Sequence, residues 1–106
     1  MKTIVHKIRL KDVSQRLAFR DWVETTDYRA CESLDSVVAF DVVEVSDSAD
    51  APFHFIEIIR LSSVEAFNVD MQTPLFQSLV SRFSEMADVV EEIEGERIGL
   101  GYTNLK

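Results

Sequence analysis

The start of the chain alternates between apolar and polar positions and then changes to a helical period. Over residues 3–10, one face carries Ile4, His6, Ile8 and Leu10. Alternation with period two predicts a β-strand, here with a polar outer face. Asp12 is a suitable helix N-cap, with Gln15 three residues later as its capping-box partner. The apolar spacing that follows predicts a helix to about residue 26, with residues 27–28 ending it or forming an irregular last turn.

The middle of the chain predicts two more strands joined by an exposed loop. Residues 36–45 are rich in Val and Phe, residues 46–52 are small or polar and end in proline, and residues 53–61 alternate again. One face of the third strand carries Phe53, Phe55, Glu57, Ile59 and Leu61. Because both of these strands are apolar on both faces for much of their length, the pattern is typical of a sheet that is buried on both sides.

The last part of the chain predicts an interrupted helix and a fourth strand. Ser62 with Glu65 forms a capping box, and the helix it starts is interrupted at Thr73-Pro74, where Thr73 caps a second helical segment. That segment has an apolar stripe of Phe76, Leu79, Val80, Phe83, Met86 and Ala87. Residues 89–98 supply the last strand, which ends at the glycines that follow.

The predicted order is β-α-β-β-α-β, an α+β fold of the ferredoxin-like kind that forms one domain over residues 1–106. Two helices cover one face of such a sheet, so the apolar second face needs another cover. A second copy of the same sheet, meeting it in a two-fold contact, is the simplest one. The sequence therefore predicts a homodimer, and a monomer with an exposed apolar patch remains the alternative.

The composition limits the cellular locations and the binding partners that are expected. The chain has 106 residues, of which 46% are hydrophobic, and a formal net charge of −8. An acidic surface without a Lys/Arg cluster disfavours nucleic acids and acidic membrane surfaces as partners. The N-terminus becomes charged too early for a signal peptide, no apolar run is long enough to span a membrane, and Cys31 is the single cysteine. We therefore expect a cytoplasmic protein.

Common cofactor motifs are absent from the sequence. The three glycines all lie after residue 94, so no glycine-rich phosphate loop is present. His6 and His54, the two histidines, lie on different predicted strands without metal-ligand spacing. We expect neither a metal site nor a nucleotide cofactor.

Two residues are candidates for acid–base chemistry. His6 shares the apolar face of the first strand, where an imidazole can bind a ligand or move a proton near neutral pH. Glu57 lies between Phe55 and Ile59, and a buried carboxylate there needs a partner, for which His6 and Arg97 are candidates. The alternatives are a hydrogen-bonded core histidine and a structural ion pair across the dimer, and the sequence does not decide between these roles.

Aromatic and sulfur-containing residues are the candidates for ligand contact. Trp22, Tyr28 and Cys31 cluster in the first helix and the turn predicted after it, and indole and phenol rings suit a planar heteroaromatic ligand. Nothing marks Cys31 as a nucleophile, and a small buried side chain is the commoner role. Phe67 and Met71 precede the helix break and are expected at a cavity mouth. Core packing is the commoner role for aromatic residues at the helical spacing of Phe76 and Phe83, and it is also the commoner role for Trp22 taken alone.

Several stretches resemble a known family. The most specific ones are Phe19-Arg20-Asp21-Trp22-Val23, Asp27-Tyr28, Cys31, Leu34-Asp35-Ser36-Val37 and Phe40-Asp41-Val42. With these, the chain resembles the RedY-like (HapK) family of dimeric α/β-barrel proteins. The third strand and the second helix, from Phe55 to Pro74, are similar to the dimeric α/β-barrel superfamily in general.

The resemblance implies a role in the biosynthesis of prodigiosin-type tripyrrole pigments, in the bipyrrole-carbaldehyde branch. It implies a homodimer whose cavity binds a pyrrolic intermediate, with Phe40 among the ligand-contacting residues and other pathway enzymes as further candidate partners. Four functions stay open: cofactor-free acid–base conversion of that intermediate, binding and escort without chemistry, cofactor-independent monooxygenation, and a purely structural interaction module.

Overall fold

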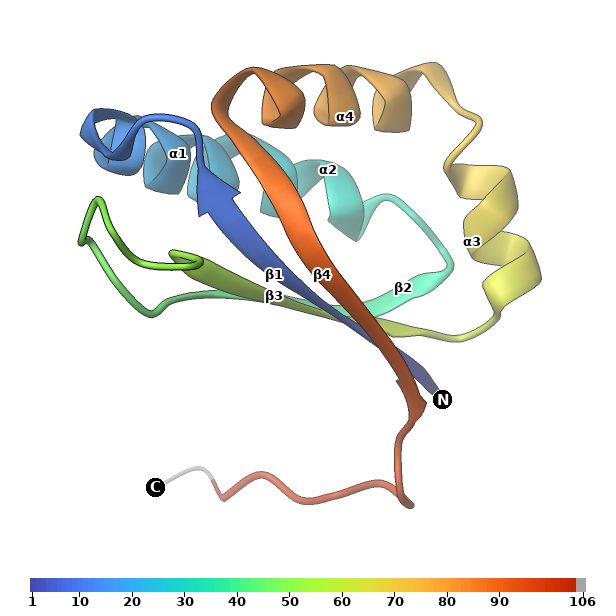
Figure 1. Cartoon of the computed structure of the whole chain (residues 1–106). Helices are drawn as coiled ribbons and strands as arrows, with labels where there is room; N and C mark the ends of the chain where they lie inside the picture. Colours follow the sequence, from blue (N-terminus) through green and yellow to red (C-terminus); the bar gives the residue numbers. More distant parts are fainter. Residues whose placement is uncertain (105–106) are drawn as a thin grey trace.

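A four-stranded antiparallel sheet forms the centre of the computed structural model, which describes residues 1–104. Its strands are β1 (Lys2–Leu10), β2 (Val37–Glu44), β3 (Phe55–Leu61) and β4 (Ala87–Glu96). They lie in the order β2-β3-β1-β4, with every neighbouring pair antiparallel. The helices lie over one face of the sheet (Figure 1). The predicted α+β, ferredoxin-like fold is therefore confirmed.

The helical segments fall into two groups along the chain. The first group is a 3-10 turn (Val13–Gln15), α1 (Arg16–Trp22), a π-helical turn (Val23–Asp27) and α2 (Tyr28–Glu32). The second group is α3 (Val64–Asp70) and α4 (Pro74–Met86). Asp12 caps the first turn, since its carboxylate accepts a hydrogen bond from the Ser14 amide at 2.9 Å.

The first helix is longer than its apolar pattern predicts. The prediction that it ends near residues 26–28 is wrong, because the π-helical turn continues directly into α2. The buried positions recur every fourth residue as Phe19, Val23, Asp27 and Cys31. An aspartate at the third of these positions hides the continuation of the pattern, because aspartate is usually exposed.

One helix cap in the second helical group differs from the predicted one. Ser63, not Ser62, caps α3, because the Ser63 hydroxyl accepts a hydrogen bond from the Ala66 amide at 3.1 Å. The Ser62 amide donates instead to the Ser36 carbonyl. The predicted restart at Thr73 is present, and its hydroxyl accepts from the Phe76 amide. Sequence spacing locates such caps only to within one residue when two serines are adjacent.

One end of the helix-covered face is filled by a tightly packed core. Phe19 lies against Phe55 with 4.7 Å between ring centroids, and it also contacts Trp22 and Phe83. The other buried members of this cluster are Ile8, Leu10, Val23, Met86 and Ala87. Burial of this apolar surface holds α1 and the end of α4 on the sheet.

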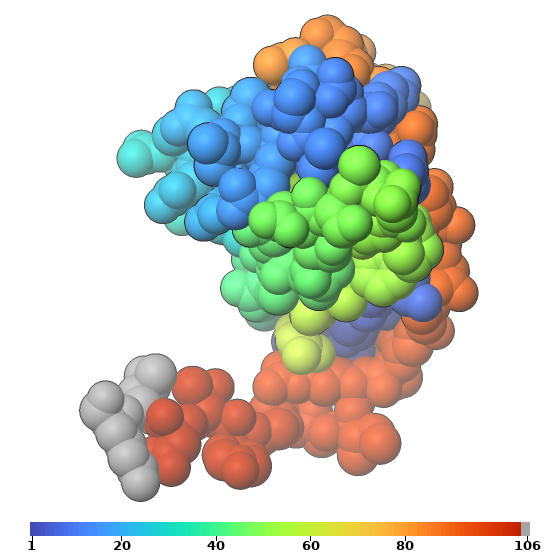
Figure 2. Space-filling model, turned by 60° about the vertical axis from the view of Figure 1, so that its left-hand side comes forward, coloured from blue at the N-terminus to red at the C-terminus, as the bar shows by residue number. Residues whose placement is uncertain are grey.

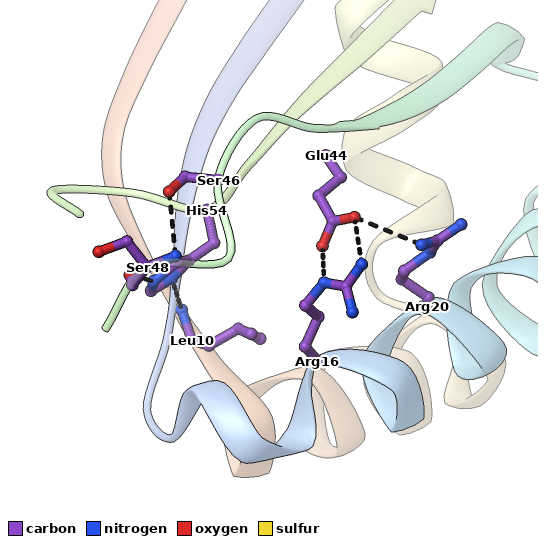
Figure 3. A network of polar contacts seen from close by, with 7 residues as sticks. All are labelled: Leu10, Arg16, Arg20, Glu44, Ser46, Ser48 and His54. Carbon is purple, nitrogen blue, oxygen red and sulfur yellow. Dashed lines mark hydrogen bonds and ion pairs between the residues drawn. The ribbon is translucent and has the colours of Figure 1, made fainter. Parts of the chain in front are cut away.

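Polar contacts close the same end of the molecule (Figure 3). The buried His54 ring accepts a hydrogen bond from the Leu10 amide through Nδ1 at 3.0 Å, and its Nε2 lies 2.9 Å from the Ser48 carbonyl. On the neighbouring strand, Glu44 pairs with Arg16 at 2.5 Å and with Arg20 at 3.3 Å. The loop between β2 and β3 and the start of α1 are thereby tied to the sheet.

The opposite face of the sheet carries no helix, and the C-terminal segment runs below it in Figure 1. Residues after β4 project from the body of the molecule, as the space-filling view shows (Figure 2). Gly99 and Gly101 there adopt φ values of 59° and 56°, which favour glycine. No helix within residues 1–104 is long and apolar enough to cross a membrane.

Candidate functional site

A cavity of about 450 Å³ opens between the sheet and the helices, beside the packed core. Residues of β1, β3 and β4 form its floor, and β2, α3, α4 and the first helical group form its walls. Its aromatic and apolar lining includes Trp22, Val37, Phe40, Ile59, Phe67, Met71, Phe76, Leu79 and Phe83. This volume and this lining suit a small, planar, mostly apolar molecule.

A histidine between two carboxylates lies on the cavity floor. In the sheet register, His6 of β1 is opposite Glu57 of β3 on one side and opposite Glu92 of β4 on the other. The His6 Nδ1 lies 3.4 Å from a Glu57 oxygen, and its Nε2 lies 2.8 Å from a Glu92 oxygen. Glu57 and His6 keep only 14% and 18% of their side-chain surface exposed, so this contact is screened little by solvent.

The two carboxylates determine the protonation of His6. Its hydrogen bond to Glu57, and then that to Glu92, raise the pKa of His6 above its ordinary value, against the opposing effect of burial. The imidazole is therefore protonated more readily than that of an ordinary histidine. It can pass a proton between the cavity and either carboxylate.

Asp27 and Cys31 form a second polar pair on the cavity wall. Asp27 is only 8% exposed, and the Cys31 thiol donates to its Oδ1 at a distance of 3.8 Å. Burial, and then the negative charge of Glu57, raise the pKa of Asp27 to about 7. Burial, followed by the charge of Asp27, raises the pKa of the Cys31 thiol to about 12. The thiol stays protonated, so the geometry gives Cys31 no nucleophilic role.

The structure brings together most of the residues that the sequence marks as candidates. His6, Glu57 and seven of the eight expected ligand-contacting residues line the cavity, namely Trp22, Cys31, Phe40, Phe67, Met71, Phe76 and Phe83. The candidate partner for Glu57 is His6, whereas Arg97 binds the Leu100 carbonyl. His6, Trp22, Phe40 and Glu57 come from four different elements, which only the folded chain brings to one place.

Tyr28 is the candidate that does not line the cavity. Its hydroxyl accepts a hydrogen bond from the Val42 amide at 2.8 Å, and its ring contacts Phe40 edge-on with 5.3 Å between centroids. It lines a separate, smaller hollow together with Arg20 and Glu44. Tyr28 therefore fixes α2 and β2 relative to each other and reaches the cavity only through Phe40.

The cavity also contains polar residues that the sequence reading did not select. These are Asp27, Asn68, Ser84, Asp88, Glu92 and Glu94. Asp27 could have been found by extending the four-residue spacing of the first helix. Glu92 and Glu94 are exposed, like all residues of the edge strand β4 after Ala87, and charged residues are common on edge strands, so no signal in the sequence separates these two from a solvated face.

The charge of this lining is one-sided. None of the described residues that line the cavity is a lysine or an arginine, whereas five carry carboxylates. Among residues 1–104, no group of three or more His, Cys, Asp and Glu side chains is arranged to hold a metal ion. The site is suited to proton transfer and to hydrogen-bond donors, and it disfavours anionic ligands.

Comparisons with known proteins agree with this architecture. HapK from Hahella chejuensis is 51% identical over 98% of this chain and 99% of its own, with a TM-score of 0.95. A putative antibiotic biosynthesis monooxygenase from Chloroflexus aurantiacus J-10-fl is 16% identical over 96% of each chain, with a TM-score of 0.73. SnoaB, a cofactor-independent oxygenase from Streptomyces nogalater, is 14% identical over 95% of this chain and 97% of its own, with a TM-score of 0.69.

The two distant structures show a shared fold and nothing further about activity. No curated protein sequence matches the chain. The family described as REDY-like protein HapK matches residues 2–98. With that match and 51% identity to the HapK structure, the chain belongs to the REDY-like HapK family.

Proposed function

We propose that the protein binds a bipyrrole-type intermediate of prodigiosin-type pigment biosynthesis in this cavity and converts it by cofactor-free acid–base chemistry. The observation that carries the proposal is the position of His6 between Glu57 and Glu92 on the floor of an otherwise largely apolar cavity. A pyrrole N–H is a hydrogen-bond donor, and the carboxylates are acceptors. Membership of the HapK family supports the choice of pathway.

The walls of the cavity suit the shape of such a molecule. Trp22, Phe40 and Phe76 approach the same space from three elements, and aromatic faces stack favourably on a planar heteroaromatic ring. A bound bipyrrole would exclude water from the floor, where charge–charge interactions are then stronger.

Proton transfer would use the chemistry of the floor directly. His6 in its protonated form can donate a proton to a carbonyl or ring carbon of the ligand, while Glu57 accepts an N–H proton or holds it by a hydrogen bond. Such a pair serves a tautomerisation, a cyclisation or a condensation. Escort without turnover uses the same binding contacts and differs only in the absence of product.

We also propose that the protein works as a homodimer through the uncovered sheet face. That face presents Val5, Ile56, Ile58 and Ile93, the first and last of which are paired neighbours on β1 and β4. In the segment after β4, Ile98, Leu100 and Tyr102 are exposed at alternate positions. A second copy would cover both groups of apolar side chains in an isologous contact.

The test is a tryptophan-fluorescence titration with a bipyrrole carbaldehyde, since Trp22 is the single tryptophan and lines the cavity. We expect saturable quenching, which His6→Ala and Glu57→Gln weaken by about tenfold or more. Glu85→Gln removes the same charge from the exposed surface of α4 and is expected to leave the affinity unchanged.

Product analysis then separates the functions. A new product formed by the wild type and lost in His6→Ala, without uptake of oxygen, is the result that acid–base conversion requires. Saturable binding without product would leave escort as the function, and oxygen uptake would identify an oxygenase. Absence of quenching up to millimolar ligand, with a folded protein in the same sample, would overturn the proposal.

A further inference from the structure

Asp27 is a nearly buried acidic side chain of the cavity with a single, weak hydrogen-bond donor. It lies at the end of the π-helical turn, which directs a position of the first helix into the cavity. Its Oδ1 has the Cys31 thiol as a distant, weak donor at 3.8 Å, and no described residue donates to its Oδ2. Since no side-chain oxygen among the described residues is both fully buried and unpartnered, Oδ2 has access to the cavity.

The groups that face Asp27 provide no positive charge of their own to balance it. The titratable residues that line the cavity are His6 from β1, Glu57 from β3, and Asp88, Glu92 and Glu94 from β4, while the cavity-lining residues of α4 are Phe76, Leu79, Val80, Phe83 and Ser84. His6 is already shared between two carboxylates. Even a protonated His6 therefore leaves the carboxylates of the sheet, Glu57, Asp88, Glu92 and Glu94, in excess over positive charge among the described lining residues.

We propose that Asp27 holds a proton in the ligand-free protein and releases it to solvent when a cationic aromatic ligand bearing N–H groups enters the cavity. The ligand's positive charge then takes the place of that proton, and the ionised carboxylate accepts an N–H hydrogen bond from the ligand. The inference rests on the proposed function because it concerns the same cavity. It adds the charge class of the ligand and a second polar contact.

The physical reason is the cost of a buried, unpaired carboxylate. In the ligand-free protein, burial and Glu57 hold the pKa of Asp27 at about 7, so at pH 6 most molecules carry the proton. A cation beside the carboxylate reverses the balance, because an opposite charge within a few ångströms favours ionisation. Binding and proton release are then linked, and the affinity for a cation rises with pH across this range.

The same arrangement predicts discrimination by charge. Neutral rings of the same shape gain the apolar contacts of the walls and leave Asp27 protonated. Anionic ligands meet five carboxylates and no lysine or arginine among the described lining residues, so they are excluded. The cavity therefore favours a protonated heteroaromatic ring system over its neutral and anionic counterparts.

Isothermal calorimetry at pH 6 with 9-aminoacridinium, a planar tricyclic cation with N–H donors, tests the proposal. Titrations in buffers of different ionisation enthalpy give the number of protons released on binding. We expect the wild type to release most of one proton, because burial and Glu57 raise the pKa of Asp27 to about 7 in the ligand-free protein. Acridone, a neutral ring of the same size, is expected to bind at least about tenfold more weakly and to release no proton.

Two variants separate Asp27 from other sources of the proton. Asp27→Asn keeps the size and polarity of the side chain. On binding 9-aminoacridinium, this variant is expected to release almost no proton, and its preference for the cation over acridone is expected to fall severalfold. Glu32→Gln removes one charge from the exposed end of α2 and is expected to behave as the wild type does.

Three outcomes would overturn the inference. Release that persists in Asp27→Asn would assign the proton to another group of the cavity, such as His6. Equal affinity for acridone and 9-aminoacridinium would show that charge does not select the ligand. Either result is compatible with a bipyrrole carbaldehyde quenching Trp22, so the proposed function would stand. If no planar ring bound, both the inference about Asp27 and the proposed function would be contradicted.

Discussion

The two ends of the helix-covered face are built from the same elements but differ in how they are filled. At one end, Phe19 and Phe55 pack directly against each other, and their cluster is almost completely buried. At the other end, Phe67 and Phe76 pack edge-on with 5.6 Å between ring centroids, and beside them lies a cavity of about 450 Å³. The first arrangement maximises apolar contact, whereas the second leaves space that a ligand can fill.

The two histidines show the same difference. His54, at the packed end, is 1% exposed, and both of its ring nitrogens are occupied by backbone groups. His6, in the cavity, has two carboxylates as partners, and one of them, Glu92, is about half exposed. A ring with backbone partners holds the chain in place, while a ring with ionisable partners can exchange protons.

The largest effect is expected from Phe19→Ala, which would open the packed end. Phe19 is 1% exposed and contacts three other aromatic rings, so the substitution should lower the free energy of unfolding by roughly 3 to 5 kcal/mol. Met71→Ala on the cavity wall should cost only about 1 kcal/mol, because part of the Met71 surface already faces the cavity. Urea denaturation of both variants measures the difference, and equal losses would contradict the distinction between the two ends.

His54→Ala should have the next largest effect on stability. The substitution leaves the Leu10 amide without its buried acceptor and releases the loop at Ser48, at a cost of roughly 2 to 4 kcal/mol. His6→Ala should change the free energy of unfolding by about 1 kcal/mol or less at pH 8, because the ion pair with the half-exposed Glu92 is screened by solvent and weakens as the pH rises. Denaturation curves of the two variants at that pH test the contrast, and the comparison fails if His6→Ala is the more damaging substitution.

The fold could be predicted from the sequence because the period of the apolar residues and the helix-capping residues are enough to locate its strands and helices. The alternation around His6 and the Thr73-Pro74 restart both correspond to observed elements. The same alternation placed His6 on the apolar face of the first strand, and it grouped Glu57 with Phe55 and Ile59 while leaving open whether that face meets the helices or the dimer partner. Strand periodicity identifies the face of a residue without any knowledge of its neighbours.

The rest depends on contacts that sequence patterns do not contain. The pairing of Glu92 with His6 follows from the register of β1 and β4, which is shifted by an irregularity after Lys7. Asp27 enters the cavity through a π-helical turn, which no propensity rule predicts. Tyr28 has the composition of a ligand contact but is used as a tie between α2 and β2. Residue type alone could not separate these roles.

A smaller, pH-dependent effect is expected from Asp27. The pKa of this carboxyl is raised from 3.8 to about 7, so the folded state binds more protons than the unfolded state between these values. Stability contributed by the neutral carboxyl is therefore present at low pH and is lost as the pH rises from about 4 through about 7. The pKa of His6 is also raised, and its contribution is lost at higher pH, as the pH passes above its folded-state value.

Asp27→Asn should remove the part of this pH-dependent loss of stability that is due to Asp27. The free energy of unfolding of the variant, compared with that of the wild type, should be roughly 1 to 3 kcal/mol more favourable at pH 8 than at pH 4. The gain is no larger because a cavity-facing carboxylate keeps part of its hydration. Glu32→Gln, exposed at the end of α2, serves as the control and should follow the wild type at every pH. Parallel curves for Asp27→Asn and the wild type would show that Asp27 ionises normally and that the cavity imposes no such cost.

The smallest effect is expected from Tyr28→Phe, which tests the boundary between the two regions. The substitution removes the hydroxyl that the Val42 amide donates to and keeps the ring against Phe40, so the free energy of unfolding should fall by about 0.5 to 1.5 kcal/mol. Affinity for a cavity ligand should remain within about twofold, because Tyr28 lines the smaller hollow and not the cavity. Urea denaturation and Trp22 fluorescence titration on the same sample provide both values. Phe40→Leu, which changes a side chain of the cavity wall itself, should show the reverse pattern, with a clear loss of affinity. If Tyr28→Phe instead weakened binding as strongly as Phe40→Leu, the cavity would extend past Phe40 to α2, and Tyr28 would have to be counted among the ligand contacts.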